Sequence, residues 1–222
     1  MSVGFYRFFD KMGKEKQRRK DEKNMLICIA REFGSGGHEI GKRLAETMGY
    51  RFYDRELVTE AAGHSSISPE LLERVDERKE NPWLHNIVYD DLNRELRGIS
   101  ANEAMFRVQS AIILEAAQKD NCVFVGRCAD DVLKKAGRKR LSIFITAPFE
   151  DRLERKRNLM HMEEKAVTAL VRKTDRQRKH YYDYYTDGNW GKPYNYDLCV
   201  NSSALGIEQT AAALAILARQ IW

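Results

Sequence analysis

A glycine-rich turn near the start of the chain has the composition of an anion-binding loop. Residues 34–37 read Gly-Ser-Gly-Gly and lie between an apolar run at 25–30 and a segment with helical periodicity. Glycine allows successive backbone amides to point toward one anion, and the first turn of a helix adds positive potential there. The turn therefore predicts a phosphate-binding site. Its expected contacts are Gly34, Ser35, Gly36, Gly37, His38 and Glu39.

The turn departs from the ordinary phosphate-loop spacing Gly-x-x-x-x-Gly-Lys-Ser/Thr. With the helix at Ile40 in register, Gly37 stands at the lysine position, His38 at the Ser/Thr position and Arg31 at the first glycine. An active kinase then needs another cation at the β- and γ-phosphates. We expect Arg31 to supply it, because Lys42 lies more than a turn further along the helix, about 7 Å along its axis. A glycine turn that only packs helix against strand is the alternative interpretation.

The distribution of charge limits the kind of partner. The chain carries 38 Lys and Arg against 33 Asp and Glu, a net charge of +5. Residues 1–23 hold eight basic and four acidic side chains, so the other 199 residues are nearly neutral at +1. A near-neutral body argues against a surface that coats a nucleic acid polymer. Residues 151–180, with ten basic and five acidic side chains, are instead a candidate site for a small polyanion.

The cysteines and the apolar content indicate a cytoplasmic protein. Cys28, Cys122, Cys128 and Cys199 form no Cys-x-x-Cys pair, so we expect reduced, mostly buried thiols rather than a zinc site. No apolar run reaches about 18 residues, and the first residues hold no long apolar stretch. We therefore expect neither a membrane span nor a signal peptide, and no membrane partner. The sequence leaves the formation of a homo-oligomer open.

Apolar runs alternate with segments of helical periodicity along the chain, which is typical of buried parallel strands and their covering helices. The sequence predicts an α/β fold of three layers (αβα) around a five-stranded parallel sheet. Residues 1–23 are expected to be a basic extension, and 24–222 a single domain. The expected strands are 25–30, 51–54, 121–126, 141–147 and 196–200. The expected helices are about 40–48, 55–63, one or two within 69–98, 100–118, one from Pro148, 163–181 and 207–221.

Five segments together resemble the cytidylate kinase-like family of P-loop nucleoside monophosphate kinases. The resemblance runs from about Leu26 to Ala218, and the segments that carry it are 31–45, 52–57, 124–130, 175–178 and 190–203. It implies ATP-dependent phosphorylation of a nucleoside monophosphate, typically CMP or dCMP, with Mg²⁺. It also implies a P-loop NTPase fold with a helical acceptor-binding insertion at about 64–100 and a lid at about 150–180.

The resemblance implies roles for several charged residues. Arg127 matches an arginine after the third strand that holds the acceptor phosphate, a task suited to a bidentate guanidinium. Asp175 and Arg178 match an Asp-x-x-Arg pair whose spacing puts both on one helix face. The resemblance implies catalytic roles, with Arg178 touching the transferring phosphate and Asp175 orienting it or holding the substrate ribose; an ordinary surface ion pair is the alternative. Arg155 and Arg157 fall at the lid arginines, which offset charge on a transferring phosphoryl group.

The expected acceptor and metal sites depart from the family pattern. The aspartate that follows the acceptor arginine and helps to read cytosine is Cys128 here, so Asp130 or Asp131 is the expected replacement. Asp54, at the end of the second expected strand, either orients groups around the acceptor phosphate or holds water on magnesium. Glu39 and Asp54 are the expected Mg²⁺ contacts, because a histidine at position 38 is a weak ligand for that ion.

Two other functions stay open. The missing lysine favours a non-catalytic nucleotide- or phosphate-binding module of the same fold. The altered cytosine-reading position favours a kinase for another small acceptor. The aromatic residues between 181 and 196 either stack on a base or pack within the protein.

Overall fold

The computed structural model describes residues 24–54 and 101–222. The basic extension expected at 1–23, the helix expected at 55–63 and the helical insertion expected at about 64–100 lie outside the described residues.

The described residues form a five-stranded parallel sheet in the order β2-β3-β1-β4-β5, which confirms the predicted sheet. All residues of β3 are buried and so are most of those of β1 and β4, as expected for apolar strands covered on both faces. The strand order places β1 at the centre, with β3 and β4 as its hydrogen-bonded neighbours. The strands are β1 (Leu26–Arg31), β2 (Arg51–Tyr53), β3 (Cys122–Val125), β4 (Leu141–Thr146) and β5 (Leu198–Asn201).

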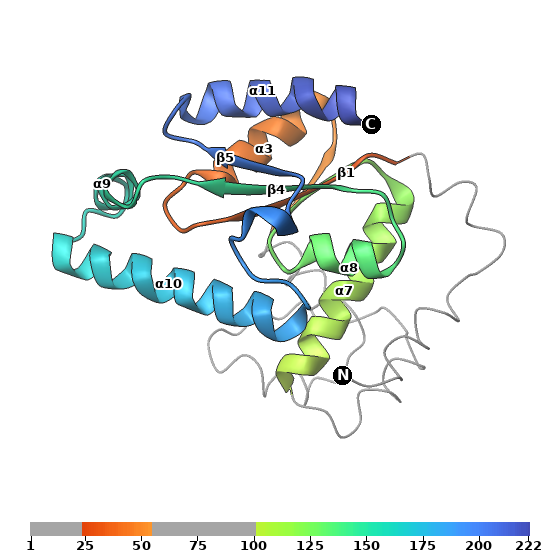
Figure 1. The fold of residues 1–222 in the computed structure, drawn as a ribbon, viewed down its shortest axis with the longest axis horizontal. Coiled ribbons are helices and arrows are strands. Elements are labelled where there is room, and N and C mark those ends of the chain that lie inside the picture. Colours follow the sequence, from red (N-terminus) through yellow and green to blue (C-terminus); the bar gives the residue numbers. More distant parts are fainter. Residues whose placement is uncertain (1–23, 55–100) are drawn as a thin grey trace, which may run out of the picture.

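Helices cover both faces of the sheet, which confirms the three-layer αβα architecture (Figure 1). On one face lie α3 (Gly37–Met48) and α11 (Gly206–Ile221), and on the other lie α7 (Ala101–Lys119) and α8 (Ala129–Lys135). The remaining helices are α9 (Phe149–Met160), α10 (Glu164–Tyr185) and the short 3₁₀ helix η1 (Pro193–Asn195). In the described part of the chain, no helix has both the length and the apolar character needed to cross a membrane.

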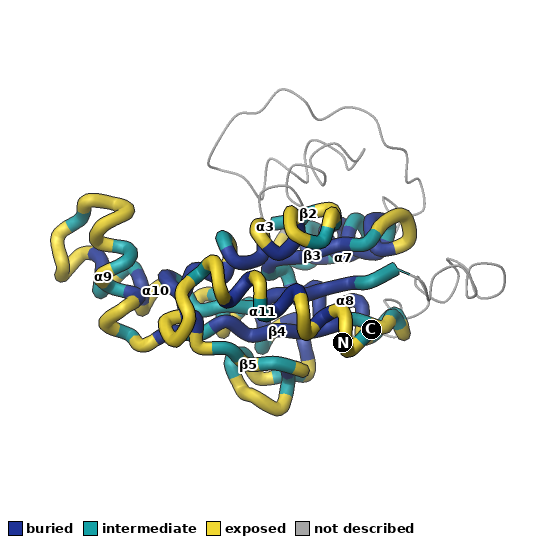
Figure 2. The backbone as a smooth tube through the Cα atoms, turned by 90° about the horizontal axis from the view of Figure 1, so that it is seen from above, coloured by how far each residue is buried: buried dark blue, intermediate teal, exposed yellow. Residues whose placement is uncertain are grey.

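The central strands are buried along most of their length (Figure 2). Their side chains alternate between the two faces of the sheet and so form two cores, one on each side. Ile27 and Ile29 face α3 and α11, where they join Leu44 and Leu214. Cys28 points to the other face, in the core that α7 and α8 cover. The sheet is therefore a rigid base for the loops that follow its strands.

Helix α10 is longer than the sequence predicted. It continues past residue 181 to Tyr185, because Tyr182 and Tyr185 are both buried and hold its last turn against the body. Tyr185 stacks on Phe106 of α7 with ring centroids 4.1 Å apart. Part of the aromatic cluster therefore serves packing, and the helix that carries Asp175 and Arg178 is fixed at its carboxyl end.

Candidate active site

The glycine turn joins the carboxyl end of β1 to α3. Gly34 and Gly36 have φ angles of 90° and 75°, and α3 begins at the next residue. The Ser35 hydroxyl donates to the carbonyl oxygens of Glu32 and Ile145 at 2.9 and 3.1 Å, and its own carbonyl accepts from Ser202. Ser35 therefore fixes the turn against β4 and β5, and its backbone amide rather than its side chain is the part suited to an anion.

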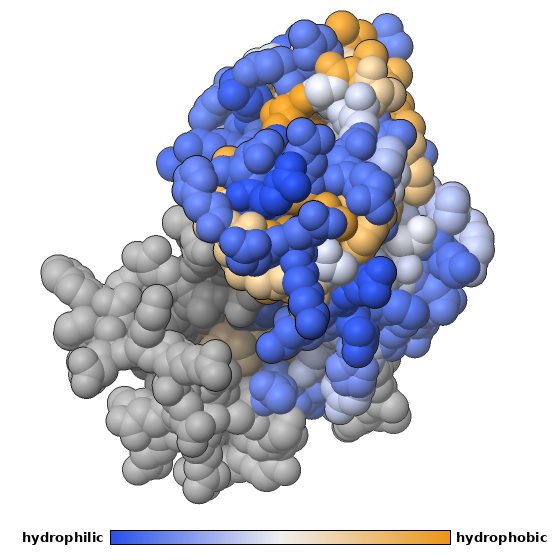
Figure 3. Space-filling model, turned by 90° about the vertical axis from the view of Figure 1, so that its left-hand side faces the viewer, coloured by the Kyte–Doolittle hydropathy of each residue, from blue (hydrophilic) through white to orange (hydrophobic). Residues whose placement is uncertain are grey.

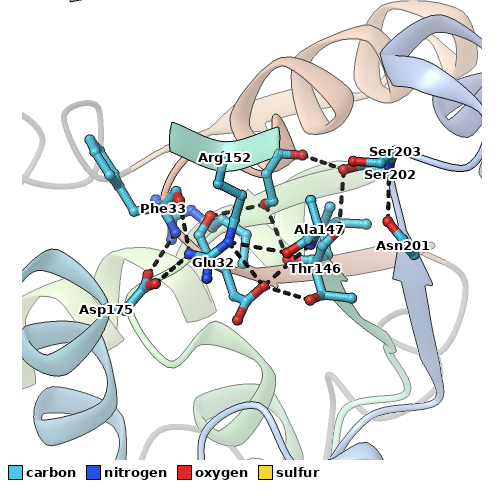
Figure 4. A network of polar contacts seen from close by, with 12 residues as sticks. Glu32, Phe33, Thr146, Ala147, Arg152, Asp175, Asn201, Ser202 and Ser203 are labelled. Carbon is cyan, nitrogen blue, oxygen red and sulfur yellow. Dashed lines mark hydrogen bonds and ion pairs between the residues drawn. The ribbon is translucent and has the colours of Figure 1, made fainter. Parts of the chain in front are cut away.

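A buried arginine holds the turn from the other side (Figure 4). Arg152, in the first turn of α9, is 6% exposed and donates to Asp175 at 2.5 Å and to the Phe33 carbonyl at 3.1 Å. Asp175 also accepts a hydrogen bond from the Phe33 amide at 2.7 Å. The second carboxylate of the network, Glu32, lies 3.5 Å from the Arg152 Nε and accepts from the Thr146 hydroxyl. These contacts tie the turn to β4, α9 and α10 at once.

Arg31 is the last residue of β1, and its side chain runs from the glycine turn to the end of β3. A Cβ atom on Gly37 would lie 2.6 Å from the Arg31 Cβ, and a Cβ atom on Gly126 would lie 2.3 Å from the Arg31 Nη1. Arg178 of α10 donates to the Arg31 carbonyl at 3.0 Å. The Arg31 guanidinium thus lies between the expected phosphate turn and the residue that precedes Arg127.

Two further cations lie over the ring of Phe33, the residue directly before the glycine turn. The Lys156 Nζ lies 4.5 Å from the centroid of the Phe33 ring, and the Arg178 Cζ lies 5.5 Å from it. Burial, together with the nearby charges of Arg155 and Arg178, lowers the pKa of the Lys156 ammonium, while Glu39 opposes this shift. An anion bound in this region would relieve the repulsion among these groups. The face that carries α9 is largely hydrophilic (Figure 3).

Glu39, in the first turn of α3, is engaged with this cationic group. Its carboxylate accepts from Arg155 at 3.0 Å. Burial favours the neutral form of Glu39, but backbone hydrogen bonding and Arg155 outweigh it and lower the pKa of the carboxyl. The Glu39 charge is therefore directed at Arg155 of α9, whose Cζ would lie 3.8 Å from a Cβ atom placed on Gly36.

A cavity of about 620 Å³ opens beside the turn, and its lining includes arginines, aromatic rings and one acid. The cationic ones are Arg31, Arg127 and Arg178. The aromatic ones include Tyr181, above which the Arg127 guanidinium lies at 5.5 Å, and Trp190. The acid is Asp130, which lines the cavity together with Cys128 and Tyr182. Arginines beside aromatic rings and one acid suit a ligand with an anionic end and a ring that carries hydrogen-bond donors.

Asp130 is the acid of this cavity. It is 7% exposed, and the Tyr182 hydroxyl donates to its carboxylate at 2.7 Å. Burial raises the pKa of Asp130 despite that hydrogen bond. Burial also raises the pKa of the Cys128 thiol, with Asp130 adding to the shift, so the thiol stays protonated and unreactive at neutral pH.

The backbone after β3 is held in an unusual conformation. Gly126, Arg127 and Cys128 are successive residues with φ angles of 88°, 57° and 55°. A left-handed conformation costs an ordinary L-residue about 1–2 kcal/mol, so two such residues in a row must be held by their surroundings. Strain of this kind is concentrated at ligand sites. Here it turns Arg127 into the cavity.

The expected metal contacts fit a magnesium ion only in part. The Asp54 carboxylate, which follows β2, lies 2.9 Å from the Nε2 atom of His38, the residue directly after the glycine turn. Within residues 24–54 and 101–222, no group of three or more His, Cys, Asp or Glu side chains could hold a metal ion. Mg²⁺ commonly takes one or two carboxylates and keeps waters and substrate phosphates as its other ligands. Both expected carboxylates already have a basic partner, since Asp54 contacts His38 and Glu39 contacts Arg155.

The structure brings most of the predicted site residues together around the turn and the cavity. Arg157 is exposed and takes no part in the contacts described above. Asp175 is used to hold the Phe33 amide and Arg152. Sequence reasoning missed Arg152 and Lys156, although both belong to the arginine- and lysine-rich segment it had singled out. Their neighbours Arg155 and Arg157 were chosen instead by resemblance alone.

The chain is similar in sequence to one protein family and in fold to several solved structures. A sequence profile of the cytidylate kinase-like family matches residues 26–204. No curated protein matches the chain. Among solved structures, an uncharacterized protein from Eubacterium ventriosum is similar with a TM-score of 0.67 at 24% identity, covering 88% of this chain and 99% of its own. Shikimate kinase from Bacteroides thetaiotaomicron is similar with a TM-score of 0.52 at 16% identity, covering 87% of this chain and 97% of its own. These two similarities are similarities of fold.

Proposed function

The chain belongs to the cytidylate kinase-like family, and from this premise we propose that it transfers the γ-phosphoryl group of ATP to a nucleoside monophosphate, CMP or dCMP. Family membership supports phosphoryl transfer in general, and the acceptor is our proposal. We expect the protein to act in the cytoplasm, where both nucleotides are available.

The observation that carries this proposal is the position of the cavity. It is lined by Arg31 and Phe33, which lie in the segment that leads from β1 into the glycine turn. Arg127 and Arg178 reach the cavity from the end of β3 and from α10. A donor phosphate on the turn and an acceptor phosphate on these arginines would therefore meet beyond the carboxyl ends of the central strands. Open parallel sheets commonly bind their ligands in this position.

In this proposal the protein contributes alignment and charge. The backbone amides of the turn hold the donor phosphates, and Arg127 grips the acceptor phosphate with its two-pronged guanidinium. Arg155, Lys156 and Arg178 offset the negative charge that spreads over the transferring group. Mg²⁺ that arrives with ATP would supply further positive charge, and Asp54 is the carboxylate we expect to bind it, directly or through water. The acceptor phosphate is already anionic at neutral pH, so no side chain need act as a general base or nucleophile.

The acid of the cavity supports an acceptor with a hydrogen-bond donor on its ring. Asp130 lines the cavity, and one of its carboxylate oxygens accepts from the Tyr182 hydroxyl. Cytosine carries an exocyclic amine that such an oxygen can accept from. Tyr181 and Trp190 offer ring faces on which a base can stack.

One observation favours a second acceptor class. Cys128 occupies the position of the family's cytosine-reading aspartate, and its thiol is buried and a poor hydrogen-bonding group. A small acceptor with an anionic group but no base would use the same arginines without that aspartate. A non-catalytic phosphate-binding module is the third candidate, favoured by Gly37 at the lysine position.

The test is ATP consumption by the purified chain with Mg²⁺ and a panel of acceptors. The panel should contain CMP, dCMP, UMP, AMP, GMP, shikimate and gluconate. CMP or dCMP should give the highest kcat/KM, and Asp130→Asn should lower this selectivity over UMP. Turnover only with shikimate or gluconate would replace the acceptor. ATP binding without turnover on any acceptor would favour the binding module.

A further inference from the structure

Arg31 and Gly37 are packed against each other so closely that each determines what the other can be. A Cβ atom on Gly37 would lie 2.6 Å from the Arg31 Cβ and 2.9 Å from its Cγ. Real Cβ atoms essentially never come so near to another heavy atom, and the Arg31 atoms concerned are the ones nearest the backbone. No side chain can therefore be added at position 37 while Arg31 keeps its place.

The same two positions carry complementary residues in an ordinary phosphate loop. The spacing Gly-x-x-x-x-Gly-Lys has a glycine at the position of Arg31 and a lysine at the position of Gly37. We propose that this chain has exchanged the two, so that Arg31 supplies the cation at the β- and γ-phosphates and Gly37 leaves it room. The inference rests on the proposed phosphoryl transfer and names the residue that makes it workable.

The path of the Arg31 side chain supports this exchange. Its Cβ and Cγ start in the space that a residue at position 37 would need, so the arginine leaves the loop where the lysine otherwise does. Its guanidinium ends against Gly126, with Nη1 2.3 Å from a Cβ placed there, beside Arg127. The cation therefore lies between the donor turn and the acceptor arginine.

The other cations approach from a different direction. Arg155 and Lys156 come from α9 and Arg178 comes from α10, so they belong to the lid. Arg155 is bound to Glu39, and Arg178 is bound to the Arg31 carbonyl. Of these basic residues, Arg31 alone extends from the strand that ends at the turn. It therefore accompanies the donor phosphates whatever position the lid takes.

A stability experiment tests the packing without any ligand. Gly37→Ala in the parent chain should lower the melting temperature by roughly 3 to 10 °C, because it overpacks the site. In an Arg31→Gly background the same change should cost much less, since the next contact is Ile145 at 3.3 Å. Equal losses in the two backgrounds would overturn the close packing, and with it the exchange.

A kinetic experiment tests the function. Arg31→Gly should lower kcat/KM for ATP by about tenfold or more. Adding Gly37→Lys to it restores the spacing Gly-x-x-x-x-Gly-Lys and should recover most of the loss. Gly37→Lys alone should be folded less stably and no more active than the parent. Lys42→Ala, an exposed lysine on the next turn of α3, is the matched control and should change kcat/KM less than twofold.

The outcomes separate this inference from the proposed function. An active parent whose kcat/KM is unchanged by Arg31→Gly would overturn the exchange and leave the kinase standing. So would a double variant no more active than Arg31→Gly alone, provided that its circular dichroism matches the parent. A parent that neither binds ATP nor consumes it on any acceptor would overturn both.

Discussion

Arg152→Met should destabilise the folded chain by about 3–5 kcal/mol, the usual cost of removing one partner of a buried ion pair. Methionine keeps most of the length and apolar bulk of arginine while it removes the charge and the donors. Arg152 is only 7% exposed over its side chain, and its partners Asp175 and Glu32 are 17% and 22% exposed. The substitution therefore leaves two carboxylates near the turn without their shared cation.

Arg43→Met is the control that isolates burial. Arg43 forms an ion pair with Glu208 at 2.8 Å, but its side chain is 48% exposed and that of Glu208 is 62% exposed. Pairs exposed to this degree contribute about 0–1 kcal/mol. The two variants thus remove the same chemical group from helices of the same fold, and the difference between them measures the buried network.

Urea titration followed by circular dichroism at 25 °C gives both free energies of unfolding. The melting temperature of Arg152→Met should fall by about 6 to 20 °C for a chain of this size. Adding Asp175→Asn to Arg152→Met should cost less than Asp175→Asn alone, because the unpaired charge has been removed while the acceptor for the Phe33 amide remains. A loss for Arg152→Met no larger than that for Arg43→Met would refute the reasoning.

Three further expectations concern the site itself. Arg127→Ala should weaken acceptor binding at least about tenfold with little change in melting temperature, measured by calorimetry and thermal unfolding; a large melting loss with unchanged affinity would make Arg127 structural. Burial raises the native pKa of Asp130, so its contribution to stability is fully present below the ordinary pKa of about 3.9 and is lost as pH rises through the native pKa. Asp130→Asn should remove that loss and raise the melting temperature at pH 7 relative to the parent, while it weakens acceptor binding; identical melting profiles between pH 4 and 8 would contradict this. A crystal soaked in sulfate should show an anion on the amides of residues 34–39, and an empty turn with sulfate bound at the cavity arginines alone would place the phosphate site elsewhere.

The fold was predictable because its signals are local. The run at 121–126 predicts a buried strand from its composition, and all residues of β3 within it are indeed buried. The glycines at 34 and 36 predict a turn because they supply left-handed backbone, and both adopt it. The order β2-β3-β1-β4-β5 was not available in the same way, since any of several parallel orders buries the same strands.

The arginine network was not predictable, because burial of a charge depends on the tertiary fold. Arg152 lies in a helix with several other basic residues, and a charged helix normally presents such side chains to water. The start of α9 packs closely over the turn, where a Cβ atom placed on Gly34 would lie 2.8 Å from the Arg152 carbonyl oxygen. Its partner Asp175 lies 23 residues further along the chain, and the family resemblance pairs Asp175 with Arg178 instead. Nothing in either local segment indicates that the two side chains meet.

The contact between Arg31 and Gly37 also restricts the order in which a chain could change from one form of phosphate loop to the other. Consider a loop with glycine at position 31 and lysine at position 37. If position 31 changed to arginine first, the new side chain would clash with the lysine still present at position 37. If position 37 changed to glycine first, no clash would arise, but the loop would have neither a lysine nor an arginine for the phosphates. Under the proposed exchange, the route without a clash would therefore cross a stage in which transfer depends on Arg155, Lys156 and Arg178. The basic residues of α9 and α10 would then have to be present before the lysine at position 37 is lost.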